Sequence, residues 1–371
     1  MKMRIAVIGC GGISDQYGNH IFRYPELLEI AGATDLDFSR AEEFTKKYGG
    51  KVFKDFDAVL ADPDVDTILN LTVHRIHFDL NKRALKAGKH VYSEKPMALT
   101  YAEANELCEL SRETGCRMAA APSTYLGEGV QTTAKFLEQK QDLLGAMRLV
   151  YAEVNWGQIN RWIPAPQSYF TVGPLLDVGV YAITALTFLL GPVRKVWGYS
   201  AILQKDRVGT DGQPFPVTAP DFTTGVMEFE NGVVARLTTN YYVPTSHMPH
   251  LLGFEFHGDQ GSFRVSDYHG FNAKCQYLPY QQREVQVPLL RENLHGMDRA
   301  VGLVDLAVAI QENRPHRASA EHAAHVVEIM EGLQRSFENS ERIAIESCFE
   351  RPPLMDWAKQ AELVVGEAPS V

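Results

Sequence analysis

Short apolar runs alternate with longer polar segments over the first third of the chain. The runs contain few polar residues, which is typical of strands covered on both faces of a parallel sheet. The segments between them have helical composition, with a capping-box pattern at Thr100 and Glu103 and an expected capping serine at Ser39. This rhythm predicts β-α units and a parallel sheet between Met3 and Tyr125. The expected strands lie in MRIAVIG, LEIAGATD, KVF, TILNLT, HVYSE and RMAAAPSTY.

The pattern changes after about Gln141. Longer runs rich in Val, Thr, Tyr and Phe follow, as in strands with one solvated face, so we expect an open, largely antiparallel sheet. Glu230-Asn231-Gly232 predicts a hairpin turn, because Asn-Gly tolerates positive φ. Helices are expected at residues 175–190, 294–313 and 320–339, the last two packing back on the first domain or on the sheet. The expected strands are RLVYAEVNW, RKVWGYSAIL, TTGVMEFENG, VVARLTTNYYV and LLGFEFHGD.

Charge and apolar length exclude several classes of function. The 371 residues carry a formal net charge of -10. That field repels phosphate backbones and anionic lipid, and no basic run offsets it, so we expect no nucleic-acid partner and no membrane partner. The longest apolar stretch, Val178 to Leu190, is too short to span a bilayer. Because the start shows no secretory pattern, we expect a cytoplasmic protein.

Cysteine and histidine usage predicts no metal site. Five cysteines make an odd number without a CxxC pair, which argues against a disulfide framework and against a cysteine zinc site. The histidines lack a carboxylate motif of zinc spacing, so we expect solvated or capping side chains. Those considered are His247, His250, His316, His322 and His325.

The first expected strand runs into a glycine-rich turn at the strand-to-helix position. Gly9 permits the tight turn, and Gly11 lets the backbone approach a pyrophosphate. Gly12 and Ile13 lead into the helix whose N-terminus meets the phosphate charge. Such a turn also occurs without a ligand, but its context here favours a dinucleotide and a Rossmann fold.

That context is Asp35, which ends the second expected strand. It stands at the offset where a carboxylate accepts from the ribose hydroxyls of adenosine. An acid there disfavours a 2′-phosphate, so we expect NAD. Arg40 keeps NADP open, because its guanidinium could pair with that phosphate. A helix-capping role is the alternative for Asp35.

Two further stretches meet the expected cofactor site: Thr72 to His77 after the fourth strand, and AGKHVYSEKP through the fifth. With these residues the chain resembles the Gfo/Idh/MocA family of nicotinamide-dependent oxidoreductases, over nearly its whole length. The resemblance implies that Lys95 stands beside the nicotinamide, that Pro96 has a cis peptide bond, and that Glu94 belongs to the same cofactor-binding motif. Thr72 and His77 match the family pattern, although His77 is equally well explained as a capping or supporting residue.

The segment VGPLLDVGVY, which ends at Tyr181, is similar to the family's GGGxLxDxGxH/Y signature. If it is helical, Asp177 and Tyr181 lie on one face, one turn apart. Many members have His at the last position, whereas the glucose-fructose oxidoreductase and dihydrodiol dehydrogenase branches have Tyr. A free phenol has a pKa of about 10, so a nearby ammonium such as that of Lys95 is needed to favour the phenolate. The alternative is a tyrosine packed in an apolar helix.

These residues predict hydride transfer between a secondary carbinol and C4 of the nicotinamide. Tyr181 or Lys95 would handle the hydroxyl proton, and Lys95 would also stabilise the developing alkoxide. Asp177 would bind the hydroxyl or orient the lysine. Tyr125 and Trp162 could line a sugar site with their ring faces; the alternative for both is a core or interface position.

The resulting prediction is an α/β protein with two domains. Residues 1–125 form an NAD(P)-binding Rossmann domain with a doubly wound parallel sheet, and residues 126–371 form an α+β domain with an open, mostly antiparallel sheet for substrate binding and oligomerisation. The resemblance implies a sugar, inositol or glycoside substrate and a homodimer or homotetramer formed through the C-terminal sheet. Three alternatives stay open: a glycoside-cleaving enzyme with recycled NAD, a trans-dihydrodiol or ketone reductase, and a non-catalytic NAD-binding regulator.

Overall fold

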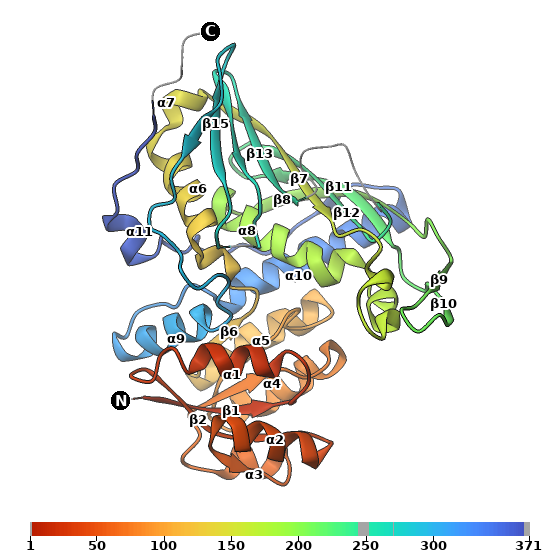
Figure 1. The fold of residues 1–371 in the computed structure, drawn as a ribbon, viewed down its shortest axis with the longest axis vertical. Coiled ribbons are helices and arrows are strands. Elements are labelled where there is room, and N and C mark those ends of the chain that lie inside the picture. Colours follow the sequence, from red (N-terminus) through yellow and green to blue (C-terminus); the bar gives the residue numbers. More distant parts are fainter. Residues whose placement is uncertain (1, 244–251, 270, 367–371) are drawn as a thin grey trace. The chain divides into compact units, whose positions relative to one another are not determined.

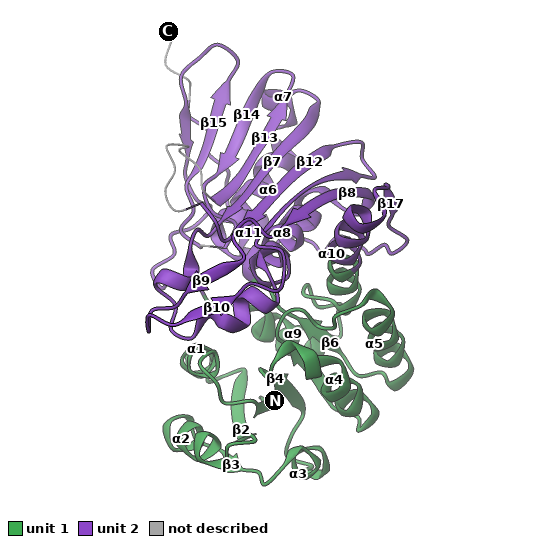
Figure 2. Ribbon diagram, turned by 90° about the vertical axis from the view of Figure 1, so that its right-hand side faces the viewer, with its two compact units in different colours: residues 1–123, 298–327 green, residues 124–297, 328–371 purple. Residues whose placement is uncertain are grey.

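The computed structural model describes residues 2–243, 252–269 and 271–366. The chain divides into two compact units (Figure 2). Unit 1 is Met1–Ser123 with Asp298–Val327, and unit 2 is Thr124–Met297 with Glu328–Val371. Neither unit is one continuous stretch of sequence.

Unit 1 contains a six-stranded sheet in the order β3-β2-β1-β4-β5-β6. All its neighbouring strands run parallel, which confirms the doubly wound sheet expected from the apolar runs. The order reverses beside β1, and in such sheets ligands bind where the order reverses, outside the carboxyl ends of the strands. The strands are β1 (Met3–Ile8), β2 (Leu28–Thr34), β3 (Lys51–Val52), β4 (Thr67–Asn70), β5 (His90–Ser93) and β6 (Met118–Ala120).

Helices cover both faces of this sheet (Figure 1). On one face α1, α2 and α9 pack against Met3, Ile5 and Val7 of β1, all of them buried. On the other face α4 and α5 pack together against β4, β5 and β6. The helices of unit 1 are α1 (Ser14–Ile21), α2 (Phe38–Tyr48), α3 (Phe56–Ala61), α4 (His77–Lys86), α5 (Tyr101–Thr114) and α9 (Val301–Gln311).

A late stretch of the chain completes unit 1. Leu303 and Leu306 of α9 are fully buried in the same core as β1. After α9 the chain returns to the sheet, where the Ala120 N–H donates to the carbonyl of Ala318 at 3.1 Å. Residues 298–327 are therefore part of this sheet's packing and of its β6 edge.

Unit 2 contains a nine-stranded sheet in the order β16-β15-β14-β13-β7-β12-β11-β8-β17. The β7–β12 pair is parallel and the other pairs are antiparallel, which confirms the open, largely antiparallel sheet. Between β8 and β11 in the sequence, β9 and β10 form a separate two-stranded sheet. The strands are β7 (Met147–Asn155), β8 (Val193–Ala201), β9 (Asp206–Val208), β10 (Pro214–Pro216), β11 (Phe222–Phe229), β12 (Val234–Asn240), β13 (Leu252–Gly258), β14 (Gly261–Val265), β15 (Cys275–Pro279), β16 (Val285–Val287) and β17 (Ile343–Ala344).

One face of the large sheet is covered and the other is open. Phe136 of α6 stacks on Phe263 of β14 with ring centroids 4.1 Å apart, and Ser336 of α10 accepts the N–H of Gly198 in β8 at 3.0 Å. The opposite face carries exposed aromatic side chains, including Trp197 of β8. The remaining helices are α6 (Glu128–Gln139), α7 (Gln141–Leu144), α8 (Val180–Leu190), α10 (Ala320–Asn339) and α11 (Asp356–Gln360).

Several local predictions are confirmed. The Asn231-Gly232 turn joins β11 to β12, with Gly232 at φ +85°. The capping box is complete, since Thr100 accepts from the Glu103 N–H and the Glu103 carboxylate accepts from the Thr100 N–H. The helix expected at residues 320–339 has those bounds as α10.

Two local predictions are wrong, and a third has the expected extent but a different winding in its first turn. Asp37, and not Ser39, caps α2, because its carboxylate accepts the Ser39 N–H at 3.2 Å. The helix expected from residue 294 begins only at Val301. Before it, the Asn293 side chain accepts the N–H groups of His295 and Gly296, a local turn that competes with helix. The helix expected from residue 175 begins with a π-helical turn, Leu175–Gly179, and continues as α8.

Candidate active site

The glycine-rich turn joins β1 to α1 in a conformation that needs glycine. Gly9 has φ +91°, and a Cβ there would stand 3.0 Å from the backbone of Leu71 and Thr72. A Cβ on Gly11 or Gly12 would meet no atom within 4 Å, so space is open beside their backbone. Ile13 stands at the N-cap of α1. The turn therefore leaves room for a phosphate group at a helix N-terminus.

A cavity of about 450 Å³ lies beside this turn. Two backbone donors orient the Asp35 carboxylate at the turn: the Cys10 N–H at 2.7 Å and the Asp37 N–H at 2.8 Å. Arg40 lines the cavity, with its Nε 3.4 Å from the Asp37 carboxylate. The lining residues are Cys10, Gly11, Gly12, Ser14, Asp15, Arg40, Glu43, Phe44 and Lys47. These residues fit the adenosine and pyrophosphate parts of a dinucleotide.

Cys10 lies buried in the glycine-rich turn. Burial, and then the charge of Asp35, raise the pKa of the Cys10 thiol to about 12. The thiol therefore stays protonated near neutral pH, which disfavours a nucleophile there.

Glu94 anchors the segment that carries Lys95. Its carboxylate is buried, and it accepts the hydroxyl of Tyr17 at 2.8 Å and the N–H of Lys95 at 3.1 Å. Burial, followed by the charge of Glu94, holds the pKa of Tyr17 well above its usual value, so Tyr17 remains a donor. The Lys95–Pro96 peptide bond is cis, as the resemblance implies. Tyr17 was not predicted from the sequence. Its place in the first turn of the helix that follows the glycine-rich turn was the one signal for a role near the cofactor site.

His77 joins two backbone segments. It is 1% exposed, with Nδ1 2.8 Å from the carbonyl of Pro96 and Nε2 2.9 Å from the carbonyl of Thr72. The Thr72 hydroxyl in turn donates to the Asn70 side chain at 2.6 Å. His77 and Thr72 thus support the loops that follow β4 and β5.

In unit 2, Asp177 lies in the π-helical turn and Tyr181 in the first turn of α8. The Tyr241 hydroxyl donates to Oδ2 of Asp177 at 2.5 Å. Burial, and then the Asp177 charge, raise the pKa of Tyr241 well above its usual value, so it remains a donor. The segment is helical, but the turn that carries Asp177 is π-helical and not α-helical, so it winds more widely than the expected spacing assumed. Tyr241 was missed; it directly follows β12, in the Asn-Tyr-Tyr run.

A series of ring contacts begins at Tyr181. The His269 ring meets the Tyr181 ring edge-on, with centroids 4.5 Å apart. Trp156 contacts His269, and Trp162 stacks on Trp156. Trp162 was a candidate from the sequence, whereas His269 and Trp156 were missed.

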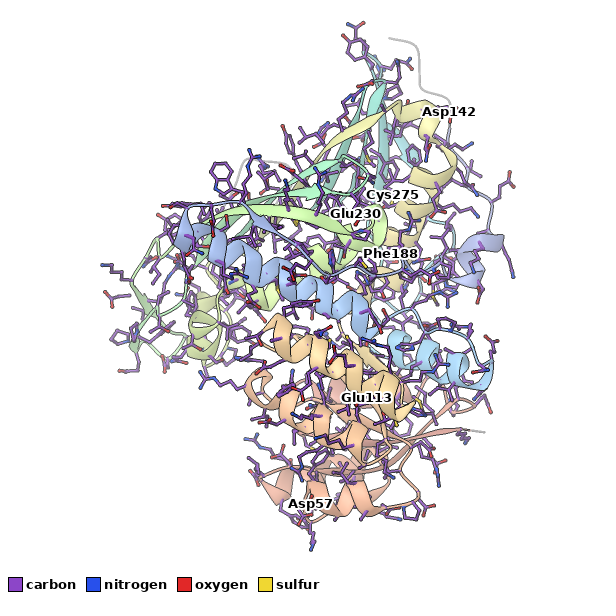
Figure 3. All side chains as sticks on the ribbon, turned by 180° about the vertical axis from the view of Figure 1, so that it is seen from behind. Asp57, Glu113, Asp142, Phe188, Glu230 and Cys275 are labelled. Atoms are coloured by element: carbon purple, nitrogen blue, oxygen red, sulfur yellow. The ribbon has the colours of Figure 1, made fainter. Side chains whose placement is uncertain are left out.

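Tyr125 has the surroundings of a core residue. It is 1% exposed, in a short 3-10 turn after β6, and its ring packs 4.9 Å from that of Phe188 on α8. Phe188 is labelled in Figure 3. No face of the Tyr125 ring is open to a sugar within unit 2.

Residues 2–243, 252–269 and 271–366 contain no group of three His, Cys, Asp or Glu side chains that could hold a metal ion. In the same residues no helix has the length and apolarity to cross a membrane. His247 and His250 lie outside the described residues.

Two family models match the chain. Residues 3–121 match the model described as an oxidoreductase family with an NAD-binding Rossmann fold. Residues 132–264 match the C-terminal domain model of the same GFO/IDH/MocA family. Together they cover more than half of the chain. The chain belongs to the GFO/IDH/MocA oxidoreductase family. It is an NAD(P)-dependent enzyme with an NAD-binding Rossmann domain.

Individual relatives in this family are distant. D-glucoside 3-dehydrogenase of Escherichia coli (strain K12) is 24% identical over 92% of this chain and 97% of its own length. Trans-1,2-dihydrobenzene-1,2-diol dehydrogenase of Bos taurus is 27% identical over 68% of this chain and 72% of its own. The solved levoglucosan dehydrogenase, in complex with NADH and L-sorbose, has a TM-score of 0.79 at 19% identity, covering 93% of this chain and 99% of that one. That likeness shows the fold.

Proposed function

We propose that this GFO/IDH/MocA enzyme transfers a hydride between a nicotinamide cofactor and a secondary hydroxyl or ketone of a sugar, inositol or glycoside. The observation that carries the proposal is the Asp177 carboxylate, held by the Tyr241 hydroxyl at 2.5 Å in the turn that leads into Tyr181. A fixed carboxylate close in sequence to a phenol suits recognition of a hydroxyl group. The sugar-acting relatives support this substrate class.

The proposed catalytic residues are Lys95, Asp177 and Tyr181. When the substrate is oxidised, its carbon gives a hydride to C4 of the bound nicotinamide and its hydroxyl gives a proton to the protein. Tyr181 or Lys95 takes that proton, and the Lys95 ammonium stabilises the alkoxide that develops. Asp177 accepts a hydrogen bond from a substrate hydroxyl, with the Tyr241 hydroxyl fixing the orientation of its carboxylate.

The proposed cofactor is NAD. Asp35, directed to the turn by two backbone donors, would accept from both ribose hydroxyls. Its charge would repel the 2′-phosphate of NADP, since like charges placed together cost several kcal/mol. Glu94, Lys95, Pro96, Thr72 and His77 complete the proposed cofactor side, the last two by supporting the loops.

We further propose a homo-oligomer formed through the open face of the large sheet, in the cytoplasm. Trp197 and Tyr199 of β8 are more than half exposed on that face, and Tyr151 lies on β7, with β11 and β12 between the two strands. Apolar patches of this kind mark protein interfaces. The five cysteines are all free, which suits a reducing compartment.

A second candidate is oxidation of trans-dihydrodiols. The aromatic rings around Tyr181 favour it, because an apolar wall suits a diol on a carbon ring, and the dihydrodiol dehydrogenases are relatives. It predicts turnover of cyclic diols that lack further hydroxyl groups.

The test is a panel of sugars, inositols, glycosides and cyclic diols assayed for reduction of NAD and of NADP. Lys95→Ala should lower the hydride-transfer rate by orders of magnitude and leave NAD binding nearly unchanged. Lys54→Ala is the matched control, because the Lys54 side chain is 81% exposed and the residue belongs to none of the proposed cofactor-binding or catalytic segments. Near-normal turnover by Lys95→Ala would overturn the assignment of Lys95.

A further inference from the structure

A series of aromatic rings runs outward from Tyr181 in unit 2. His269 is edge-on to Tyr181 at 4.5 Å, and Trp156 is edge-on to His269 at 5.9 Å. Trp162 stacks on Trp156 at 6.3 Å, with 26° between the ring planes. The series begins at a buried tyrosine, 7% exposed, and ends at a tryptophan that is 55% exposed.

Backbone hydrogen bonds fix the main chain at both tryptophans. The backbone N–H of Trp156 donates to the carbonyl of Asn240 at 3.2 Å. The next residue, Tyr241, is the one that donates to Asp177. The end of β12 therefore contacts both the main chain of Trp156 and the Asp177 carboxylate. The backbone N–H of Trp162 donates to the carbonyl of Ile159 at 3.2 Å.

We propose that the Trp156–Trp162 pair is a binding subsite for the second ring of a glycoside whose first ring reacts at Tyr181. This inference rests on the proposed function and narrows its substrate to glycosides with a cyclic aglycone, either another sugar or an aryl group. The electron-rich face of an indole attracts the positive edge of C–H groups and aromatic rings. Covering that face also removes apolar surface from water.

The position of Trp162 in the series distinguishes it from an ordinary exposed side chain. A single exposed tryptophan needs no ligand. Trp162 instead continues a chain of ring contacts that reaches Tyr181. Because Trp162 is three ring contacts away from Tyr181, a ring bound against Trp162 would be the second ring of the substrate and not the one that reacts.

The test compares glycosides that differ only in the second ring. Methyl β-glucoside has none, cellobiose has a sugar, and phenyl β-glucoside has an aryl group. In Trp162→Ala, the KM for cellobiose and phenyl glucoside should rise about tenfold, equivalent to about 1.4 kcal/mol, while the KM for methyl glucoside and every kcat stay within about twofold. Trp162→Phe should recover most of the loss, because it keeps a ring.

Tyr280→Ala is the matched control, since Tyr280 is an aromatic residue in the turn after β15 and is 68% exposed. It should behave as the unmodified enzyme does. An equal rise for all three glycosides in Trp162→Ala, or no rise for any, overturns the subsite while the oxidoreductase function stands.

Calorimetric binding of phenyl glucoside separates the two proposals if no glycoside reduces the cofactor. Weaker binding in Trp162→Ala than in Tyr280→Ala would then support the subsite although the proposed reaction had failed. Equal binding in both variants would overturn the subsite.

Discussion

Arg207 and Asp221 form a buried ion pair in unit 2. Nη2 of Arg207 lies 2.6 Å from Oδ2 of Asp221, and the two side chains are 1% and 0% exposed. The guanidinium also lies over the rings of Phe170 and Tyr242, at 5.3 and 5.9 Å. The other Asp221 oxygen accepts the Leu203 N–H at 2.6 Å. The pair thus joins β9 to the residue that precedes β11, 14 residues along the chain.

Removing one charge of this pair should cost far more than removing both. Arg207→Met leaves the Asp221 carboxylate buried without a counter-charge, which costs about 3–5 kcal/mol of the free energy of unfolding. Asp221→Asn strands the guanidinium and should cost a similar amount. The double variant removes both charges and keeps an acceptor for Leu203. Because Arg207 Nε finds no acceptor among the described residues, the native pair is itself incompletely bonded. The double variant should therefore lose only about 1 kcal/mol.

The assay is urea unfolding of the four proteins, with the free energies combined in a double-mutant cycle. We expect a coupling energy of at least about 2 kcal/mol, in the sense that the two changes compensate. The control is Arg148→Met, which removes an ion pair to Asp259 whose side chains are 70% and 46% exposed, and which should cost less than about 1 kcal/mol. If the two single losses simply add, within about 0.5 kcal/mol, the reasoning about buried charge is refuted.

Three further predictions concern the catalytic side, the cofactor and pH. Tyr241→Phe removes the donor to Asp177. Because a hydrogen bond to a charged group is worth about 1.5–3 kcal/mol, kcat should fall about tenfold or more while the KM for NAD stays unchanged. An unchanged kcat in steady-state kinetics would contradict this role of Tyr241. Asp35→Ser removes the charge that repels a 2′-phosphate, so the ratio of kcat/KM for NADP to that for NAD should rise at least about tenfold; a ratio that stays constant would remove Asp35 from cofactor selection. Burial lowers the pKa of His90, whose Nδ1 accepts the Arg117 N–H at 2.9 Å and must be unprotonated to do so. Below a pH of about 6.5 the unfolded chain therefore binds more protons than the folded one, so the free energy of unfolding should decrease as the pH falls. The decrease should be less steep in His90→Asn, which keeps an acceptor but does not titrate. Equal slopes for the two proteins in a urea unfolding series would contradict the contribution of His90 to this pH dependence.

The sequence predicted unit 1 better than unit 2 for a physical reason. Strands such as β1 and β4 are buried on both faces, so the local apolar run and the final environment agree. In the large sheet, the longer strands β7, β8, β11, β12 and β13 were also found, whereas the five-residue strands β14 and β15 were missed. Short strands such as β9, β10 and β16 were missed, because three residues are too few to show a period.

The site residues that were missed share a different cause. Tyr17 lies 77 residues from Glu94 in sequence, and Tyr241 lies 64 residues from Asp177. Each pairing exists only after the chain has folded, and no spacing rule connects them. The π-helical turn was missed for a related reason, because a run of residues such as Leu175–Gly179 fits either winding and the surrounding packing decides.

Unit 1 is built from two separate stretches of sequence, with consequences for how this enzyme can be divided. A fragment that ends at Ser123 would lack α9, and the apolar side chains of β1 that Leu303 and Leu306 cover would meet water. It would also leave the β6 edge, where Ala120 now donates to Ala318, open to pairing with another chain. Such a fragment should aggregate, whereas residues 1–123 produced together with residues 298–327 should not. A cofactor module that is interrupted in this way cannot be moved to another protein as one continuous stretch of sequence, so a change of its nucleotide preference is better made by point substitution, as at Asp35.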